Sequence, residues 1–410
     1  MVEPVEWILR QARIDDDGPL VDIALNAGAI VAIGERLPQH GQQGWDIAGR
    51  IVLPGLVDAH VHLDKSFLEL PNQSGNLLEA INVWLVARQS LNRASFMARA
   101  ERALQQAVSN GTTALRTHVD TLETQDLVAL EAILEVREVW RHAVDLQVVA
   151  LGAPGRSTAH DEVMRTALAL GADLVGGAPT LEDDPTHAIA TVFALAEASG
   201  KPIDLHIDEC EDPQANALAT LAEQTTAHGM QGKVTAGHCC SLAYMNDLTA
   251  GQTIEQVARA QLNIITLPSC NLVLQGRQQQ PAPRGITRVG ELLAAGITVC
   301  AASDNVADPF NPFGAYDLLQ IANLNAHVAH MAGASEIIAS LGMVTEQPAH
   351  VMGLAAYGIR PGASADFVVV DAPSRRAAVT TIAPRLGVFK RGQLVVRTVI
   401  ERTWLAGMTR

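Results

Sequence analysis

The sequence predicts an α/β protein: a (β/α)8 barrel of the TIM type with a small β-sandwich domain formed by both ends of the chain. From Gly55 onward, short apolar runs alternate with longer helical patterns, which is typical of parallel strands joined by crossover helices. Eight such runs follow one another, the number that closes a barrel of this type. Both ends of the chain show short alternating strands instead. We therefore expect residues 1–54 and 358–410 to form the β domain and residues 55–357 to form the barrel.

The β domain is predicted from hairpin patterns at both ends. Near the start, an alternating run at residues 7–14 is followed by a second stretch at 21–37, within which residues 26–28 form a hairpin turn between alternating runs. Near the end, strand-like residues 364–373 and 385–397 follow, the latter with a turn at Arg391 and Gly392. One small domain that uses both ends is the most economical arrangement of these strands.

The eight predicted barrel strands are short apolar runs bounded by polar or turn residues. The helical patterns between them include 95–111, 130–140 and 186–200, and Gly200 is expected to cap the last of these. Because the carboxyl ends of barrel strands share one face, we expect the active site there. The predicted strands are 56–62, 113–120, 146–152, 173–179, 202–209, 234–239, 263–268 and 298–305.

Composition excludes several classes of protein. A chain of 410 residues with 48% hydrophobic residues can bury a large core, and its formal net charge of −15 argues against nucleic acid or an anionic membrane as partner. The five cysteines are odd in number and lack CxxC spacing, which favours free thiols in a reducing compartment. We find neither a secretory signal pattern nor the roughly 20 apolar residues of a membrane span. A cytoplasmic protein is therefore expected.

Two histidines at the end of the first barrel strand indicate chemistry. A strand alternates its faces with period two, so His60 and His62 project from the same side while Val61 points away. Imidazole is the commonest protein ligand of metals, and this pair would offer two ligands at a fixed separation. The pattern therefore predicts a metal site completed by other strands.

Further ionisable residues stand at the ends of three later strands. His206 and Glu209 end the fifth predicted strand, His238 ends the sixth and Asp304 lies in the eighth. Three imidazoles and one carboxylate around a divalent ion leave a position for water, which is the open coordination that catalysis needs. The shared placement at one barrel face predicts a metal-dependent hydrolase.

Several motifs give the chain a resemblance to a known family. The stretches DAHVHLDKSF, HIDE, AGH and SDN resemble the amidohydrolase superfamily, and specifically its cytosine deaminase branch. The likeness extends through RTHVD, DLQVVA, LQGR with RGITRV, the DPF-NPFG loop and YGIRPGASADFVVV. The same motifs are similar to those of N-isopropylammelide isopropylaminohydrolase, which removes an alkylamine from a triazine ring.

The resemblance implies a role for each residue of the site. One zinc or iron(II) ion is implied, since the predicted fourth strand lacks the lysine that bridges two ions in other branches. Glu209 matches the acid–base carboxylate, and His238 matches the residue that orients or deprotonates a water, with Asp304 also holding that water toward the substrate. A homo-oligomer is implied as well. The residues that match the metal ligands are His60, His62, His206 and Asp304.

The resemblance implies a deaminase that hydrolyses an exocyclic C–N bond of a cytosine-like pyrimidine and releases ammonia, but two positions depart from the pattern. Ala153 stands where the branch has a glutamine that contacts cytosine, and Asn305 stands where it has an aspartate. Three alternatives stay open: an N-alkylamino-triazine hydrolase, a ring-opening cyclic amidohydrolase, which would need the absent lysine, and a ligand-binding barrel without catalysis. The predicted substrate contacts are Ala153, Asn271, Gln275, Asn305 and Phe310, with Phe313 nearby in the chain.

Other residues are expected to have structural roles. His118 ends the second predicted strand, where a contact with the site and a structural hydrogen bond are about equally expected. Lys65 is expected to pair with an acid at the barrel mouth. His327 and His330 resemble a ligand pair, but helix packing is the preferred interpretation because the ligand set is already filled.

Overall fold

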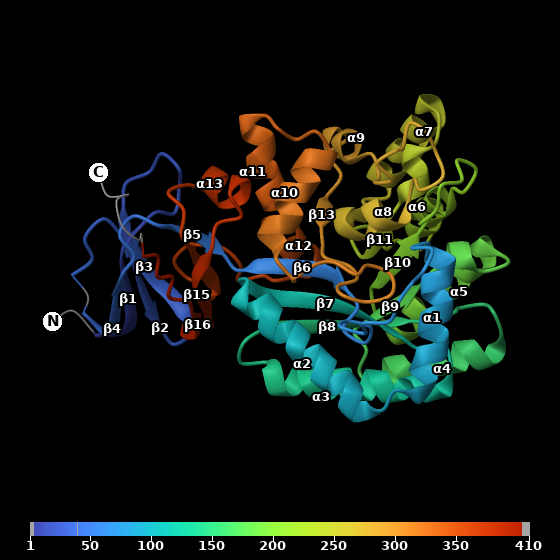
Figure 1. Cartoon of the computed structure of the whole chain (residues 1–410), viewed down its shortest axis with the longest axis horizontal. Helices are drawn as coiled ribbons and strands as arrows, with labels where there is room; N and C mark the ends of the chain where they lie inside the picture. Colours follow the sequence, from blue (N-terminus) through green and yellow to red (C-terminus); the bar gives the residue numbers. More distant parts are fainter. Residues whose placement is uncertain (1–3, 39, 404–410) are drawn as a thin grey trace.

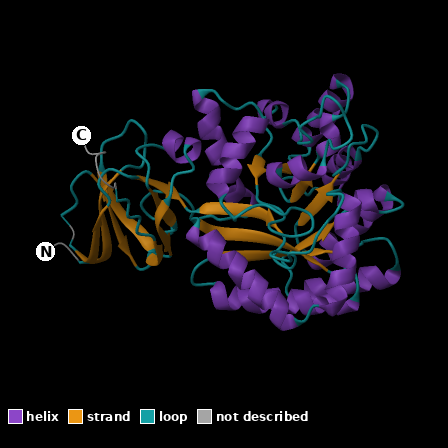
Figure 2. Cartoon of the chain, viewed as in Figure 1, coloured by secondary structure: helices purple, strands orange, loops and turns teal. Residues whose placement is uncertain are grey.

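The structure is a computed structural model that describes residues 4–38 and 40–403, so the predicted segments 1–54 and 358–410 extend beyond the described residues. Two layers of strands lie at one end of the molecule, and a larger body of strands surrounded by helices forms the rest (Figures 1 and 2). The predicted barrel with additional sheets from both ends of the chain is confirmed. No helix in the described part of the chain has the length and apolar content to cross a membrane.

The terminal strands form two sheets whose facing side chains make one small core. One sheet has the order β3-β2-β1-β4 and the other β16-β15-β14-β5. Trp7 and Phe389, from different sheets, pack edge to face with ring centroids 5.3 Å apart, and Phe367 stacks on Phe389. The predicted turns at residues 27–28 and 391–392 are present. The strands are β1 (Val5–Ala12), β2 (Val21–Asn26), β3 (Ala29–Gly34), β4 (Gly41–Asp46), β5 (Ile51–Pro54), β14 (Phe367–Val370), β15 (Arg385–Lys390) and β16 (Gln393–Arg397).

The barrel is a parallel sheet of eight strands within the described residues, in the order of the chain. It closes between its first and last strands, where the amide of Asp304 donates to the carbonyl of His60 at 2.9 Å and Val61 bridges to Asp304. All eight predicted strands are confirmed. They are β6 (Leu56–Val61), β7 (Thr112–Asp120), β8 (Asp145–Leu151), β9 (Leu174–Gly177), β10 (Ile203–Ile207), β11 (Val234–His238), β12 (Asn263–Thr266) and β13 (Val299–Ala301).

Several strands end earlier than their sequence suggests. The predicted strands 202–209 and 298–305 stop at Ile207 and Ala301, so Glu209 and Asp304 lie in the turns that follow. Asp208 and Asp304 have positive φ values of 49° and 59°, a conformation that ends the regular alternation of a strand. The turns direct the side chains of Glu209 and Asp304 into the cavity, whereas a longer regular strand would fix their directions by alternation.

Helices cover the outside of the barrel and begin at recognisable caps. Asn92 accepts a hydrogen bond from the amide of Ser95 at the start of α2, and Gly200, with φ of 69°, ends α5 as predicted. The helices are α1 (Leu77–Ala87), α2 (Arg93–Ser109), α3 (Leu127–Trp140), α4 (Thr158–Leu170), α5 (Pro185–Ser199), α6 (Ala217–Ala227), α7 (Asp247–Arg259), α8 (Pro268–Leu274), α9 (Val289–Ala294), α10 (Leu318–Val328), α11 (Ala334–Gly342), α12 (Glu346–Val351) and α13 (Arg375–Thr380), with 3-10 turns η1 (Arg88–Ser90), η2 (Thr124–Asp126), η3 (Pro179–Leu181) and η4 (Cys240–Ala243).

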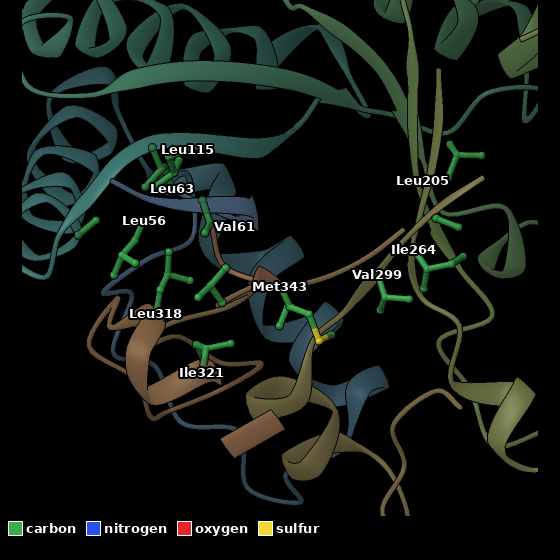
Figure 3. Packing of buried hydrophobic residues seen from close by; sticks show 14 of the residues in the cluster. Leu56, Val61, Leu63, Leu115, Leu205, Ile264, Val299, Leu318, Ile321 and Met343 are labelled. Carbon is green, nitrogen blue, oxygen red and sulfur yellow. The ribbon is translucent and has the colours of Figure 1, made fainter. Parts of the chain in front are cut away.

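The main core lies between the barrel strands and these helices. Figure 3 shows Leu56 and Val61 of β6 near Leu318 and Ile321 of α10, with Met343 beside them. Every one of these residues is buried. Burial of this kind stabilises the barrel by about 25 cal/mol per Å² of apolar surface and fixes the strand ends that carry the site.

One buried cation connects the terminal sheets to the barrel. Lys390 of β15 donates to Asp366 and to Asp145 of β8, both at 2.7 Å, and to the carbonyl of Thr113 at 3.0 Å. Its side chain is almost fully buried, whereas Asp145 is about one-third exposed. The ion pair between Lys390 and Asp145 therefore joins a terminal sheet to the barrel.

We expect Lys390→Met to lower the free energy of unfolding by about 3 kcal/mol, because it leaves two carboxylates without their shared cation. The expected loss lies at the lower end for a buried pair, since Arg391 also contacts Asp145. Urea unfolding followed by circular dichroism measures it. Lys233→Ala, at an exposed position, is the matched control and should change stability by less than about 0.5 kcal/mol. Equal free energies of unfolding for the two variants would contradict the role of Lys390 in joining the terminal sheets to the barrel.

Candidate metal centre and active site

The site begins with the two histidines that the sequence places on one face of β6. His60 lies within the strand and His62 just after it, and both are buried. The barrel closure brings Asp304 beside them, and His206 of β10 approaches from across the barrel. Four side chains from three separate strand ends thus converge on one point.

The separations of the converging atoms match those of ligands around one ion. Nε2 of His206 lies 3.2 Å from Nε2 of His60 and 3.2 Å from Nε2 of His62. Asp304 Oδ1 lies 3.3 Å from His62 Nε2 and 3.6 Å from His60 Nε2. Ligand atoms about 2.0–2.1 Å from a tetrahedral ion stand roughly 3.3 Å apart.

The protonation of these groups also fits a cation. Burial, together with the neighbouring histidines, holds the pKa of His60 and of His206 well below the usual value, so both rings are neutral. Neither oxygen of the buried Asp304 carboxylate has a hydrogen bond within the described chain. Neutral nitrogens and a carboxylate that face one another without donors are the arrangement that a divalent ion satisfies. The residues present therefore fit one metal ion.

Glu209 and His238 lie beside this cluster. Glu209 Oε1 is 3.4 Å from Nδ1 of His238, and Nδ2 of Asn271 is 3.0 Å from the same nitrogen. Burial, with the nearby charge of Asp304, raises the pKa of Glu209 well above that of an ordinary carboxyl group. Burial lowers the pKa of His238 to about 4, although the charge of Asp304 opposes the shift. A carboxyl group whose pKa is raised and an imidazole whose pKa is lowered therefore stand together, an arrangement suited to proton transfer.

The turn at Asp208 explains how His206 and Glu209 reach the same cavity. They are three residues apart, which would place them on opposite faces of a continuing strand. The left-handed backbone of Asp208 breaks that alternation. Its carboxylate accepts the amides of Ala217 and Leu218 at 3.1 and 3.0 Å, at the start of α6. The beginning of one helix thus fixes the strand end that carries Glu209.

His118 lies behind the metal ligands rather than in the cavity wall. Its ring is 4.0 Å from that of His60 between centroids, and one ligand atom each from His60, His118 and His206 fall within 4.8 Å of one another. Neither ring nitrogen has a hydrogen bond to any described residue, although Nε2 lies 3.6 Å from Asp204. Of the two expectations for His118, the contact with the site is the one observed.

Lys65 pairs with acids at the barrel mouth, as predicted. Its ammonium lies 2.7 Å from Asp120 and 3.1 Å from Asp64, and 3.5 Å from Nδ1 of His62. Trp84 of α1 donates to the other oxygen of Asp120 at 2.5 Å. Sequence analysis missed this connection between α1 and His62, because it joins a helix, the end of a strand and a loop through side-chain contacts.

A cavity of about 430 Å³ opens onto the cluster. His62, His206, Glu209, His238 and Asp304 line its inner end. Its remaining wall comes from α1, from the loops after β7, β8 and β9, and from the loop after β13. The residues of that wall are Lys65, Leu77, Leu78, Ile81, Trp84, Leu85, Arg88, Asp120, Leu122, Glu123, Leu151, Gly152, Arg156, His160, Ala178, Leu181, Glu182, Asn305 and Phe310.

Two of the five predicted substrate contacts line the cavity, and three do not. Asn305 and Phe310 line the cavity, and the amide of Asn305 donates to Asp308 at 2.6 Å. Among the described lining residues, Ala153, Asn271 and Gln275 do not appear: Asn271 lies behind His238, and neighbouring Gly152 lines the wall in place of the buried Ala153. Whether a side chain reaches the cavity depends on the conformation of its loop, which the match to a family pattern does not give.

The remaining predicted alternatives lie elsewhere. His327 bonds through Nδ1 to the carbonyl of Asn323 at 2.8 Å, and His330 contacts Arg284, so neither joins the cluster. Phe313 is 65% exposed. The preferred interpretation of the two histidines as structural agrees with these contacts.

Comparison with known proteins agrees with the fold and the site. Residues 86–409 match the amidohydrolase family. The chain is 33% identical to a pterin deaminase of Rhizobium rhizogenes over 365 residues, covering 86% of this chain and 82% of that protein. It superposes with a TM-score of 0.92 on 5-methylcytosine deaminase from Klebsiella pneumoniae, at 30% identity and 97% and 99% coverage. It also superposes with a TM-score of 0.84 on N-isopropylammelide isopropylaminohydrolase from Burkholderia multivorans. The two chains are 31% identical, and the match covers 96% of this chain and 98% of that one.

The chain belongs to the amidohydrolase family, and it is a hydrolase that acts on carbon–nitrogen bonds other than peptide bonds. These relatives confirm the resemblance to the cytosine deaminase branch of the family. The family depends on a metal, and the cluster of histidines and Asp304 is suited to hold one.

We expect Asp304→Ala to lose most of its metal, because the variant removes the only carboxylate among the four converging described side chains. Elemental analysis after expression in medium supplemented with zinc or iron should find less than about half an equivalent per chain. The exposed Asp183→Ala is the control and should keep the content of the parent protein. Unchanged metal in Asp304→Ala would exclude this residue as a ligand.

Proposed function

We propose that this protein is a metal-dependent aminohydrolase that removes an exocyclic amino group from a small nitrogen heterocycle and releases ammonia. In the reaction, water replaces the amine on a ring carbon, so that R–NH2 and H2O become the ring carbonyl compound and NH3. The observation that carries the proposal is the contact between Glu209 and His238, 3.4 Å apart at the inner end of the cavity. Two relatives named as deaminases support it.

Glu209 supplies the proton that such a substrate needs. Because its pKa is raised, the carboxyl group holds a proton at neutral pH and donates it to the ring nitrogen beside the amine-bearing carbon. That carbon then becomes more electrophilic. His238, whose Nε2 has no partner among the described residues, hydrogen-bonds to the attacking water. Glu209 afterwards takes the remaining proton of the added water oxygen and passes it to the amino group, so that the C–N bond breaks, NH3 leaves and the ring carbonyl forms.

We propose that His60, His62, His206 and Asp304 hold one zinc or iron(II) ion. Nitrogen and oxygen ligands in this combination suit both metals. When bound, such an ion supplies a nucleophile at neutral pH, because it lowers the pKa of water from about 15.7 to about 7. Asp304 also accepts a hydrogen bond that orients the water toward the substrate.

A second candidate is the removal of an alkylamine from a triazine. The observation that favours it is the apolar wall of α1, which would accommodate the alkyl group of the leaving amine. The similarity to an N-isopropylammelide hydrolase supports it too. Assays that detect ammonia and alkylamines separately, over cytosine, isocytosine, 5-substituted cytosines, ammelide, N-alkylated triazines and creatinine, distinguish the two reactions. Alkylamine release with no ammonia from any ring would exclude the deaminase.

We expect Glu209→Gln to keep its metal and lose activity. The amide preserves the size of the side chain but cannot transfer the proton, and general acid–base catalysis contributes about 10²–10⁴-fold to rate. Steady-state kinetics with elemental analysis of the same preparation measures both properties. An active variant would remove Glu209 from proton transfer, and an inactive variant without metal would assign it a structural role instead. Glu211→Gln, on the following loop, is the matched control.

A further inference from the structure

We propose that the substrate carries an uncharged fused second ring that lies against α1. This inference rests on the proposed function, since it concerns the part of the same cavity that lies away from the reacting groups. A cavity of about 430 Å³ falls within the range of about 300–1,000 Å³ that holds drug-sized ligands, and the reacting groups occupy only its inner end.

The outer wall is apolar and comes from several elements. Leu77, Ile81 and Leu85 of α1 line the cavity. Leu122, after β7, and Leu181 of η3 line it as well. Leu181 is 53% exposed. Apolar side chains held open to solvent at the mouth of a site gain stability when an apolar ligand covers them.

Hydrogen bonds hold α1 in place. Trp84 is buried and donates through its indole nitrogen to Asp120, which in turn accepts from Lys65. Asn76 caps the start of the helix by accepting the amide of Glu79 at 2.9 Å. These contacts connect α1 to Lys65, whose ammonium lies 3.5 Å from Nδ1 of His62, and so fix the wall relative to the cluster.

The charged groups of the same wall neutralise one another. Lys65 pairs with Asp120 at 2.7 Å, and Arg156 makes two hydrogen bonds to Glu182 at 2.7 and 2.8 Å. Arg88 contacts Glu123 at 3.3 Å. Every cation among the described lining residues outside the histidine cluster thus has an acidic partner in that lining. The pairing favours a neutral extension over a phosphate or carboxylate, which would have to displace Glu182 or Glu123.

Matched rings test the size of the substrate. Isocytosine, guanine and pterin share one aminopyrimidinone ring, and the latter two add a fused ring. We expect kcat/KM for at least one fused ring to exceed that for isocytosine and for cytosine by tenfold or more, since apolar contacts of this size give roughly 10–200-fold discrimination. Equal or faster hydrolysis of both single rings would overturn the inference and leave the proposed function intact.

Binding of the products keeps the test independent of turnover. Uracil and lumazine are the deaminated forms of isocytosine and pterin, and their affinities for the metal-loaded protein can be compared by the shift in Tm at equal concentration. We expect the larger shift with lumazine. No ammonia from any ring would overturn the proposed function, whereas equal shifts with both products would overturn the extension.

Variants of the wall locate the contact. Ile81→Ala should lower kcat/KM for the preferred fused ring about tenfold and change that for isocytosine less than about twofold. Leu181→Ala, on a separate element, should act in the same direction and guards against a folding defect in α1. Val86→Ala is the matched control, because Val86 lies on the same helix, is 72% exposed and does not line the cavity as described. Equal losses for both rings would assign Ile81 a structural role and overturn the inference.

Discussion

The closure of the barrel is the contact on which the site depends. Within the described residues, the amide of Asp304 donates to the carbonyl of His60 at 2.9 Å and the amide of Ser303 donates to Asp58 at 3.1 Å, and these hydrogen bonds join the segment after the last strand to the first strand. Two of the candidate ligand atoms, Nε2 of His60 and Oδ1 of Asp304, lie 3.6 Å apart at this seam. Any change that opens this seam would separate the carboxylate from the imidazoles, so fold closure and metal binding are expected to be lost together. This explains why the ligand set joins residues almost 250 positions apart.

Burial then decides the chemistry of the assembled groups. Removal from water lowers the pKa of His60, His206 and His238 and raises that of Glu209. The pKa of Asp304 is lowered although burial opposes this shift, because His62, 3.3 Å away, and His238 lie beside its carboxylate. A water-filled site would lose these differences. Helix α1 covers part of the cavity, and the cations Lys65 and Arg156 of the outer wall are paired with acids of the same wall.

Much of the fold could be predicted from local patterns. Period-two alternation placed His60 and His62 on one face, and eight apolar runs separated by helical patterns gave the barrel. The ends of the strands were less accurate, because the left-handed conformations of Asp208 and Asp304 are set by their tertiary contacts, such as the acceptance of two α6 amides by Asp208. Position along the chain likewise did not reveal that Ala153 and Gln275 miss the cavity lining, or that Trp84 is connected to His62.

The sequence by itself determined the architecture, the family and the set of residue types available for metal binding, because each follows from periodicity or from motifs that are local in the chain. Only the tertiary structure decided which of these residues converge, how their protons are distributed and what forms the outer wall of the cavity. The physical reason is that distances of about 3 Å between ligands, desolvation and apolar enclosure arise from packing between distant segments. His118 illustrates the difference. Its motif RTHVD is local in the sequence, but the contact of its ring with that of His60 exists only in the folded barrel.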